Sequence, residues 1–549
     1  MDDMHSPIWT HLTSQSRMTG TWRSALPRYQ DQPSPCLGAC PVNGRIAEWM
    51  NQIKEGDLHG AWVTLTDNNP FPAIAGRICH HPCETACNRR DHDETVGICS
   101  LERFVGDTAL QEGWRFPMPA LERAQSIAIV GSGPAGLSAA YQLRRKGFQV
   151  SLYEAKGQLG GLMRYGIPAY RLARDVLDDE INRIIEMGVT LHIGQDVSGA
   201  AKLNVLRKRH AAVFLATGAA RPKQLPTLDY DQPWVVDSAL FLAAEALEQA
   251  QWVGRHVLVI GGGSAAMDVS RTARRHGSDV TVLTLEGIDQ LPAQSAEIEE
   301  AKEEGVRFET GAMLLQAAQS MGAVTAQCQH VEFIPATATR TFEVTPLRRS
   351  EFKLHVDTII PAIGQDADLV NWGDMLAPDG PVIDTDGNMQ TSCKGVFAGG
   401  DLASLSRFVT EAIGMGKQAA QGIAAALDDT TPKAAPQINL SVRNDRINTA
   451  YQQPHKRTRQ TLQPIETRLE SFIEAQKPLT ADDARREATR CFSCGTCIYC
   501  DNCYFYCPDV AISKVDGGYV VDPDYCKGCG LCVAECPTGS IHMEEDESL

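Results

Sequence analysis

The chain has 549 residues, of which 43% are hydrophobic and 22% charged, and its formal net charge is -17. This length predicts about three or four domains with enough apolar residues for several cores. The acidic charge argues against a nucleic-acid partner, and the lack of any run of about 18 apolar residues argues against a membrane span. Because the N-terminus shows no basic flank leading into an apolar stretch, we expect a cytoplasmic protein.

The cysteines are distributed unevenly along the chain. Sixteen of the 18 lie before residue 100 or after residue 490, in spacings that suit iron-sulfur ligation better than disulfides. Thiolate ligands of this kind require a reducing compartment. The other two, Cys328 and Cys393, are expected to pack as small apolar residues.

The first two segments differ in character. Residues 1–35 are polar and interrupted by prolines, which predicts an extended N-terminal arm. Residues 36–120 hold six cysteines and a stretch with apolar residues at helical spacing, which predicts a helical iron-sulfur domain. The apolar positions are Ile46, Trp49, Met50 and Ile53.

A dinucleotide-binding pattern begins within residues 121–250. The apolar strand 126–130 runs into the glycine motif 131–136 and a helix over 137–147. These glycines permit a tight turn and close approach of the backbone to a pyrophosphate, and the helix N-terminus supplies N–H donors. Glu154 ends the next strand, at the distance where a carboxylate takes the ribose hydroxyls. We therefore predict the first part of an FAD-binding domain here.

A second copy of the pattern lies within residues 251–365. Strand 256–260 leads into the glycine motif 261–266, and a later strand over 280–285 ends at Glu286. Two such units indicate two dinucleotides, and this segment is predicted as an NAD(P)-binding domain. The alternative is that one unit is a relic that only packs.

The remaining segments frame this second unit. Apolar stretches at 213–218 and 396–401 fit one sheet that the second unit interrupts, so residues 366–426 are predicted as the second part of the FAD-binding domain. Residues 427–485 are polar, with several prolines, and are predicted as a linker.

The C-terminal segment, residues 486–549, carries two successive C-x2-C-x2-C-x3-C-P runs. In this spacing thiolates hold two [4Fe-4S] clusters, and the fourth cysteine of each run crosses to the other cluster. The predicted ligands are Cys497, Cys500, Cys503, Cys507, Cys526, Cys529, Cys532 and Cys536. A zinc ribbon, the alternative, needs only four ligands and gives no reason for the repeated Cys-Pro. The acidic end, residues 544–547, favours solubility or docking to a basic protein surface.

Five motifs together make the chain resemble the glutamate synthase small-subunit family. The motifs are residues 131–136, 160–168, 216–219, 261–268 and 399–401. That family includes the flavin half of dihydropyrimidine dehydrogenase and the large subunit of the bifurcating ferredoxin:NADP transhydrogenase. The similarity covers residues 36–425. It implies FAD in the first unit, NAD(P)H in the second and iron-sulfur clusters near the N-terminus.

The resemblance also implies a set of cofactor-binding positions. They are Gly131, Gly133, Pro134, Ala135, Gly136, Glu154, Gly161, Leu162, Arg164, Gly166, Thr217, Gly218, Gly261, Gly263, Ser264, Ala265, Glu286, Gly364, Gly400, Asp401 and Thr410. A helix starting near Thr410 would point its dipole at the isoalloxazine, where it would stabilise the anion of reduced flavin.

The second nucleotide site departs from the family at the end of its second strand. Relatives that use NADP typically have Tyr-Arg-Arg there, whereas this chain has Thr284-Leu285-Glu286. A carboxylate accepts hydrogen bonds from a free 2'-hydroxyl and repels a 2'-phosphate, which favours NADH. Three arginines on the following helix, Arg271, Arg274 and Arg275, leave NADPH open because they are placed to reach a phosphate.

The N-terminal clusters depart from the family as well. The ligands that the resemblance implies for one intact cluster are Cys40, Cys79, Cys83 and Glu102. A second cluster is broken, because the chain lacks the family's C-x2-C pair before Cys36. Cys36 and Cys87 align with the remaining half of that cluster. Cys99 falls off the family pattern and is expected to pack as a small apolar residue.

Cys491 and Cys494 precede the ferredoxin runs in a motif that resembles the missing N-terminal pair. We hypothesise that they complete the broken cluster with Cys36 and Cys87, within one chain or across a dimer. The alternative is that these four residues are free or merely packed thiols.

These features predict an α/β protein with two Rossmann-like dinucleotide-binding domains, a helical N-terminal iron-sulfur domain and a C-terminal α+β dicluster ferredoxin domain. The predicted function is that of an iron-sulfur flavoprotein oxidoreductase that moves electrons between NAD(P)H and a ferredoxin or partner redox enzyme, in a homodimer or a hetero-complex. Its cofactors would be FAD, NAD(H) or NADP(H), and at least three [4Fe-4S] clusters, or four if the tail completes the broken one. The tail resembles variants that feed 2-oxoacid:acceptor oxidoreductases or siroheme sulfite reductase.

Two other functions remain open. One is a glutamate synthase small subunit, against which the ferredoxin tail argues. The other is a non-catalytic electron-transfer or assembly subunit, against which the intact glycines of both units argue. No side chain is identified as an acid-base catalyst, so the catalytic residues are unknown.

Overall fold

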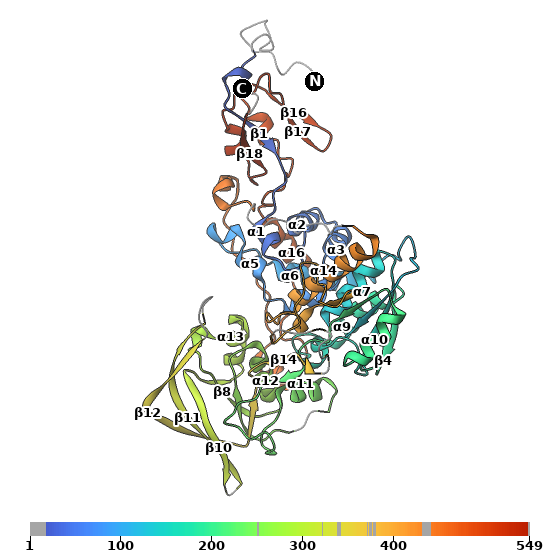
Figure 1. The fold of residues 1–549 in the computed structure, drawn as a ribbon. Helices are drawn as coiled ribbons and strands as arrows, with labels where there is room; N and C mark the ends of the chain where they lie inside the picture. Colours follow the sequence, from blue (N-terminus) through green and yellow to red (C-terminus); the bar gives the residue numbers. More distant parts are fainter. Residues whose placement is uncertain are drawn as a thin grey trace.

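The computed structural model describes residues 18–249, 252–320, 322–336, 342–370, 372, 376, 380–430 and 441–546. The terminal segments of the chain lie together at the top of the molecule, a group of helices follows below them, and the two parallel sheets lie lower still (Figure 1). Among the described residues, none of the helices has the length and apolar character that a membrane crossing requires.

Short helices form the N-terminal iron-sulfur segment. They are α1 (Pro35–Ala39), α2 (Ile46–Glu55), α3 (Leu58–Thr66), α4 (Pro72–Ile78), α5 (Pro82–Thr85) and α6 (Ile98–Gln111). The apolar positions predicted from helical spacing in α2, among them Trp49 and Met50, are buried on one face. The helix ends at Gly56, whose φ of 84° is the left-handed conformation typical of such a cap.

The first parallel sheet has five strands in the order β15-β5-β2-β3-β4. They are β15 (Val396–Ala398), β5 (Ala212–Leu215), β2 (Ser126–Val130), β3 (Gln149–Glu154) and β4 (Thr190–Ile193). The central strands are apolar on both faces because helices cover both sides. The covering helices are α7 (Pro134–Arg145), α8 (Leu162–Tyr165), α9 (Arg174–Ile185), α10 (Ala200–Arg209) and α14 (Val409–Asp428). Since β15 follows the second unit in sequence, this sheet is built from two separated parts of the chain.

Helix α7 begins earlier than the glycine motif alone predicts. We expected it over 137–147, but it starts at Pro134, the first helical position, where a missing N–H costs nothing. Its partner α14 approaches it closely at Gly416, where a Cβ atom would lie 2.1 Å from the backbone oxygen of Ala135. The absence of a side chain at Gly416 therefore sets the distance between the two helices.

The second parallel sheet has the order β13-β7-β8-β9. Its strands are β13 (Thr358–Pro361), β7 (His256–Ile260), β8 (Asp279–Leu283) and β9 (Arg307–Glu309). The helices around it are α11 (Ser238–Ala246), α12 (Ser264–Arg275) and α13 (Ser295–Glu303). Strand β8 ends two residues before the predicted end at Leu285, because the Thr284 hydroxyl donates a hydrogen bond to the Glu286 carbonyl oxygen and turns the chain.

Two smaller sheets adjoin the second unit. A three-stranded antiparallel sheet, β10 (Ala312–Ser320), β11 (Ala323–Ile334) and β12 (Glu343–Val356), projects from it at the lower left of Figure 1. A short antiparallel pair joins β6 (Arg221–Pro222) and β14 (Gln365–Asp366), where the chain crosses between the two units.

The C-terminal segment forms the ferredoxin-like end of the molecule. It contains α17 (Asn502–Phe505), α18 (Leu531–Ala534), β16 (Ile512–Val515), β17 (Gly518–Val521) and β18 (Ile541–Glu545). Part of the predicted N-terminal arm belongs to it, since β1 (Ala25–Tyr29) pairs antiparallel with β18. Arg23 and Arg28 form ion pairs with Asp546 and Glu544, so they neutralise part of the acidic end, whose last predicted residue, Glu547, lies outside the described residues.

The segment predicted as a linker is tied to the rest of the molecule. Arg468 in α15 (Ile465–Glu470) pairs with Glu303 at 2.7 Å, and Glu474 pairs with Arg77 and Arg103 of the N-terminal helices. Helix α16 (Ala481–Thr489) then packs on α2 through buried alanines. The boundary predicted at residue 486 falls inside this helix.

The close approach of α7 and α14 yields a test. Replacing Gly416→Val should lower the free energy of unfolding by about 1–3 kcal/mol, because the new side chain would overlap the Ala135 backbone. Gly387→Val is the matched control, since nothing lies within 4 Å of its Cβ position. Equal denaturant midpoints for the two variants would contradict this account of the contact.

Candidate cofactor sites

The first glycine turn has the features of a pyrophosphate site. Gly131 follows β2 with φ of 102°, and a Cβ there would lie 2.3 Å from the Ala216 backbone oxygen, so only glycine fits. Gly133 caps α7 without any side-chain hydrogen bond, and nothing lies within 4 Å of its Cβ position. The first N–H groups of α7 therefore remain available to an anion.

Glu154 lies against this turn, as its predicted ribose-binding role requires. The side chain is only 8% exposed. Its carboxylate accepts hydrogen bonds from the Ser132 N–H at 3.0 Å and the Lys156 N–H at 2.8 Å. These bonds hold the acid at the carboxyl end of β3 beside the glycine turn.

Four other predicted flavin-site residues divide into two groups. Gly161 and Gly400 close over the turn, since their Cβ positions lie 2.8 Å from the Gly133 Cα and 3.1 Å from the Ala135 Cβ. Asp401 lies beside them, and burial raises the pKa of its carboxyl. Arg164 instead donates to the Leu159 carbonyl oxygen at 2.6 Å and pairs with Asp178, so it links α8 to the preceding loop and to α9.

The start of α14 connects the flavin fold to the cysteines. Its N-cap residue, Phe408, makes no side-chain cap hydrogen bond and stacks on His80 with ring centroids 3.9 Å apart. In the first turn, the buried Thr410 hydroxyl lies 3.6 Å from the Cys79 sulfur. The predicted isoalloxazine position thus adjoins Cys79, one of the predicted ligands of the N-terminal cluster.

The second glycine turn repeats the first. Gly261 has φ of 132° and its Cβ position lies 2.4 Å from the Ala362 backbone oxygen, while Gly263 caps α12 without a side-chain bond and with open space around it. The Glu286 carboxylate is 3.3 Å from the Cβ position of Gly262. Glu286 therefore lies against the turn, as its predicted ribose-binding position requires.

The three arginines of α12 are engaged elsewhere. Arg271 and Arg275 are buried and pair with Glu304 at 2.8 and 2.7 Å. Arg274 donates to the backbone oxygen of Glu304 at 2.9 Å and to that of Ser278 at 2.6 Å. These contacts join α12 to the end of α13 and hold the three guanidinium groups there.

The four residues of the predicted N-terminal cluster lie together. Burial raises the pKa of Cys40 to about 11, and the charges of Glu102 and Cys79 act on it as well. Burial and neighbouring Cys79 likewise raise the pKa of Glu102 to about 8, while the Asn69 amide donates to its carboxylate at 2.8 Å. Burial and the charges of Cys40 and Cys79 raise the pKa of Cys83.

Cys99 is buried, as expected of a small packed residue. Its hydrogen bond to Cys79 is also the main cause that lowers the pKa of Cys79 to about 7. Cys99 lies three residues before Glu102 in α6, and residues at that spacing share one helix face. That spacing was a signal that could have placed Cys99 beside the cluster.

The ferredoxin cysteines also group as expected. A cavity of about 280 Å³ is lined by Cys497, Cys500 and Cys503 of the first run together with Cys536 of the second. The charges that act on Cys532 come from Cys507, Cys526 and Cys529, the complementary set. Each run therefore sends its fourth cysteine to the other group, which is the crossed arrangement of dicluster ferredoxins.

A further cavity, of about 390 Å³, is lined by Cys36, Cys87, Cys491 and Cys494. The described residues include no group of three or more His, Cys, Asp or Glu side chains placed to bind a single metal ion. A cubane cluster presents one iron to each of four thiolates and keeps the sulfurs further apart than one ion does.

Three parts of the chain match known protein families. Residues 125–416, more than half of the chain, match the family described as pyridine nucleotide-disulphide oxidoreductase. The chain belongs to that family. Residues 28–114 match dihydropyrimidine dehydrogenase domain II, a 4Fe-4S cluster domain, and residues 519–542 match a 4Fe-4S binding domain. These matches confirm the predicted α/β fold class, with iron-sulfur segments at both ends of an oxidoreductase core.

Curated relatives confirm the resemblance to glutamate synthase small subunits. The small chain of glutamate synthase [NADPH] from Azospirillum brasilense is 34% identical over 71% of this chain and 85% of its own. The NADP(+)-dependent formate dehydrogenase subunit beta of Moorella thermoacetica is 30% identical over 84% and 70%. An NAD-dependent dihydropyrimidine dehydrogenase subunit PreT homolog from Salmonella typhi is 33% identical over 71% and 90%. Among solved structures, Mycobacterium tuberculosis FprA in complex with NADPH has a TM-score of 0.48 at 15% identity, over 58% of this chain and 88% of that one.

Proposed function

We propose that the chain transfers electrons between a nicotinamide dinucleotide, preferably NADH, and a partner redox protein. The observation that carries the proposal is the contact of 3.6 Å between Thr410 and Cys79. It joins the predicted flavin position to the cysteine groups without an intervening segment. When bound, FAD would accept two electrons as hydride from the nicotinamide and release them singly to iron-sulfur clusters.

The chain's own residues bind and orient these groups. The free helix N-termini at Gly133 and Gly263 offer N–H donors to two pyrophosphates, and Glu154 and Glu286 lie where the ribose hydroxyls would be held. In both sites nothing lies within 4 Å of the Cβ position of the capping glycine, Gly133 or Gly263, so the space in front of each helix is free. This favours two bound dinucleotides over the alternative of one relic unit or a non-catalytic subunit.

The ferredoxin end supports a protein partner. Cys500 and Cys529 are exposed, so the predicted clusters reach the surface. Large apolar side chains are exposed nearby in sequence, including Tyr499 at 58% and Phe505 at 68%. Such groups mark interaction surfaces on proteins. We propose that the partner is a ferredoxin or the catalytic subunit of a 2-oxoacid:acceptor oxidoreductase or sulfite reductase-type system.

Subunit names among the relatives support a hetero-complex but leave its chemistry open. The formate dehydrogenase, glutamate synthase and dihydropyrimidine dehydrogenase relatives are each named as one chain of a larger enzyme. A glutamate synthase small subunit is therefore the second candidate. It is less favoured because the Azospirillum relative matches only 71% of this chain.

Cofactor content tests the proposal first. Purified anaerobically, the protein should contain FAD and at least three [4Fe-4S] clusters, so about twelve or more iron atoms per FAD. Iron and flavin analysis of the same sample measures this ratio. About eight or fewer irons per FAD would rule out the N-terminal cluster at Cys40, Cys79, Cys83 and Glu102.

Nucleotide preference tests the role of Glu286. NADH should reduce the flavin with a higher kcat/KM than NADPH, and Glu286→Arg should shift the preference toward NADPH by on the order of ten-fold or more, because a new phosphate contact is worth more than about 1 kcal/mol. Asp289→Arg, an exposed acid nearby, is the matched charge control and should leave the ratio near that of the wild type. A wild-type preference for NADPH would contradict the assignment.

A further inference from the structure

We propose that Cys36, Cys87, Cys491 and Cys494 bind one [4Fe-4S] cluster within a single chain. The four thiols come from three segments of the sequence and line one cavity of about 390 Å³. Two of them lie next to ligands of the predicted N-terminal cluster, and two come from the segment that enters the ferredoxin. The rest of the lining is mostly apolar, including Ile46, Met50 and Phe492.

Hydrogen-bond donors reach all four sulfur atoms. The Ser34 hydroxyl lies 3.1 Å from the Cys36 sulfur, and the Asn88 amide donates to the Cys494 sulfur at 3.5 Å. The Ser493 N–H lies 3.4 Å from the Cys491 sulfur, and backbone N–H groups donate to Cys87. Thiols that merely pack need no such set, whereas thiolates of a cluster are stabilised and tuned by these bonds.

The surroundings favour a bound cation. The four thiols are half-buried in a cavity lined mostly by apolar side chains, where four thiolates without a cation would be unfavourable. Bound iron would neutralise the thiolates, so binding would also stabilise the fold.

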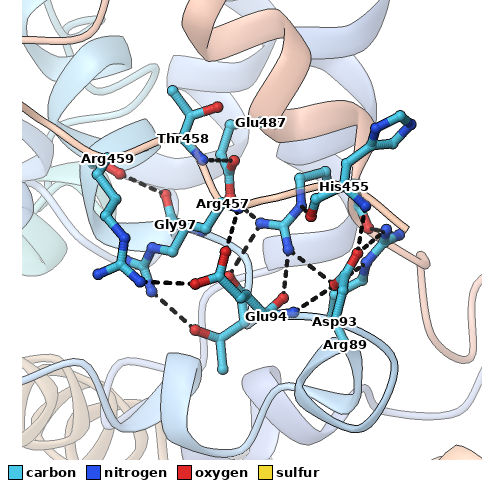
Figure 2. Close-up of polar contacts among 12 residues, drawn as sticks. Arg89, Asp93, Glu94, Gly97, His455, Arg457, Thr458, Arg459 and Glu487 are labelled. Atoms are coloured by element: carbon cyan, nitrogen blue, oxygen red, sulfur yellow. Dashed lines mark hydrogen bonds and ion pairs between the residues drawn. The ribbon is translucent and has the colours of Figure 1, made fainter. Parts of the chain in front are cut away.

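A buried network of hydrogen bonds and ion pairs around Glu487 and Arg490 positions Cys491 and Cys494. The Glu487 carboxylate, with no exposed surface, accepts the Gly97 and Thr458 N–H groups, each at 2.7 Å (Figure 2). Arg490 pairs with Glu487 at 2.6 Å and donates to the Glu94 carbonyl oxygen at 2.6 Å. These contacts end one residue before Cys491.

Residues of the N-terminal segment also contact the segment that carries Cys491 and Cys494. Arg89 donates to the Arg490 carbonyl oxygen at 2.8 Å and pairs with Asp93 at 2.6 Å (Figure 2). Its guanidinium lies 4.8 Å from the ring centroid of Phe492, between the two ligands. Lys54 donates to the Cys491 carbonyl oxygen at 3.2 Å. Because both sides of the cavity are held in this way, the four sulfurs converge without a second chain.

The site would also lie on the path of electrons between the flavin and the ferredoxin end, an inference that rests on the proposed function. Cys36 and Cys40 stand one turn apart at α1, and Cys494 and Cys497 are three residues apart. The proposed cluster would therefore adjoin the N-terminal cluster on one side and the first ferredoxin cluster on the other. Each transfer through it would move one electron, oxidising one neighbour and reducing the next, with no bond made or broken.

Iron content of the full-length holoprotein tests the site directly. We expect about sixteen iron atoms per FAD in the wild type and about twelve in the Cys491→Ser/Cys494→Ser double variant. Cys393→Ser is the matched control, a half-buried cysteine outside every group, and should keep the wild-type ratio. Wild-type protein with about twelve irons, or a double variant with no loss, would overturn the proposal.

A second measurement covers a double variant that fails to fold. In the native wild type, iodoacetamide should label Cys36, Cys87, Cys491 and Cys494 at least ten-fold more slowly than after iron chelation, as followed by mass spectrometry. Labelling rates that chelation leaves unchanged would overturn the site.

The site and the proposed function can fail separately. Dithionite reduction followed by electron paramagnetic resonance counts clusters without NADH, and we expect one signal fewer in the double variant. Sixteen irons with no flavin reduction by NADH or NADPH would refute the proposed function and keep the site. Rapid flavin reduction with about twelve irons would do the reverse.

Discussion

The arrangement of cysteines after residue 490 depends on one buried charge network. Glu487 and Arg490 are 0% and 4% exposed, and their partners include Gly97 and Asp93 of the N-terminal segment as well as Thr458. Removing one member of a buried pair typically costs about 3–5 kcal/mol, because the other charge is left without a partner. The network therefore fixes the direction in which the chain enters the ferredoxin end. The predicted linker, residues 427–485, also takes part, because the Thr458 N–H donates to Glu487 and Glu474 pairs with Arg77.

A second constraint acts where the flavin fold meets the N-terminal helices. Gly416 lets α14 lie against α7, and a Cβ at Gly414 would lie 2.4 Å from the Pro41 backbone oxygen, just after Cys40. The same helix thus touches the glycine turn of the flavin site on one side and the cysteine segment on the other. Because both contacts are made at glycine, the backbones approach more closely than any side chain would allow. Thr410 reaches Cys79 as a consequence of this packing.

The sequence predicted those features whose signals are local. The strands 126–130 and 256–260 match β2 and β7 residue for residue, because an apolar run before a glycine turn has few other solutions. The apolar face of α2 followed from its spacing, and the cysteine groups followed from runs in which covalent spacing limits geometry. The resemblance to a known family supplied Glu102 as a candidate ligand that no local pattern marks, and the structure places it beside Cys79.

Other features are non-local, and for that reason they were not predictable. Strand β1 pairs Leu26 with Glu544 across almost the whole chain, and Pro27 inside it weakens any strand signal, although an edge strand tolerates proline. The ion pairs of Arg271 and Arg275 with Glu304 depend on how α12 meets α13, so spacing along α12 left their direction open. Cys99 is different, because its spacing of three residues from Glu102 places both on one face of α6 and is readable from the sequence.

The connection into the ferredoxin end is held by close backbone contacts. Gly495, between Cys494 and Cys497, has φ of 76°, and a Cβ there would lie 2.1 Å from the Gln32 backbone oxygen. The Gly495 N–H donates to the Thr538 carbonyl oxygen at 2.7 Å, and the Gly495 carbonyl oxygen accepts the Gln32 N–H at 3.1 Å. These bonds hold the connection against the N-terminal arm and the ferredoxin end. The partner proposed above would dock at the face where Cys500 and Cys529 are exposed, because those cysteines bring the predicted clusters to the surface.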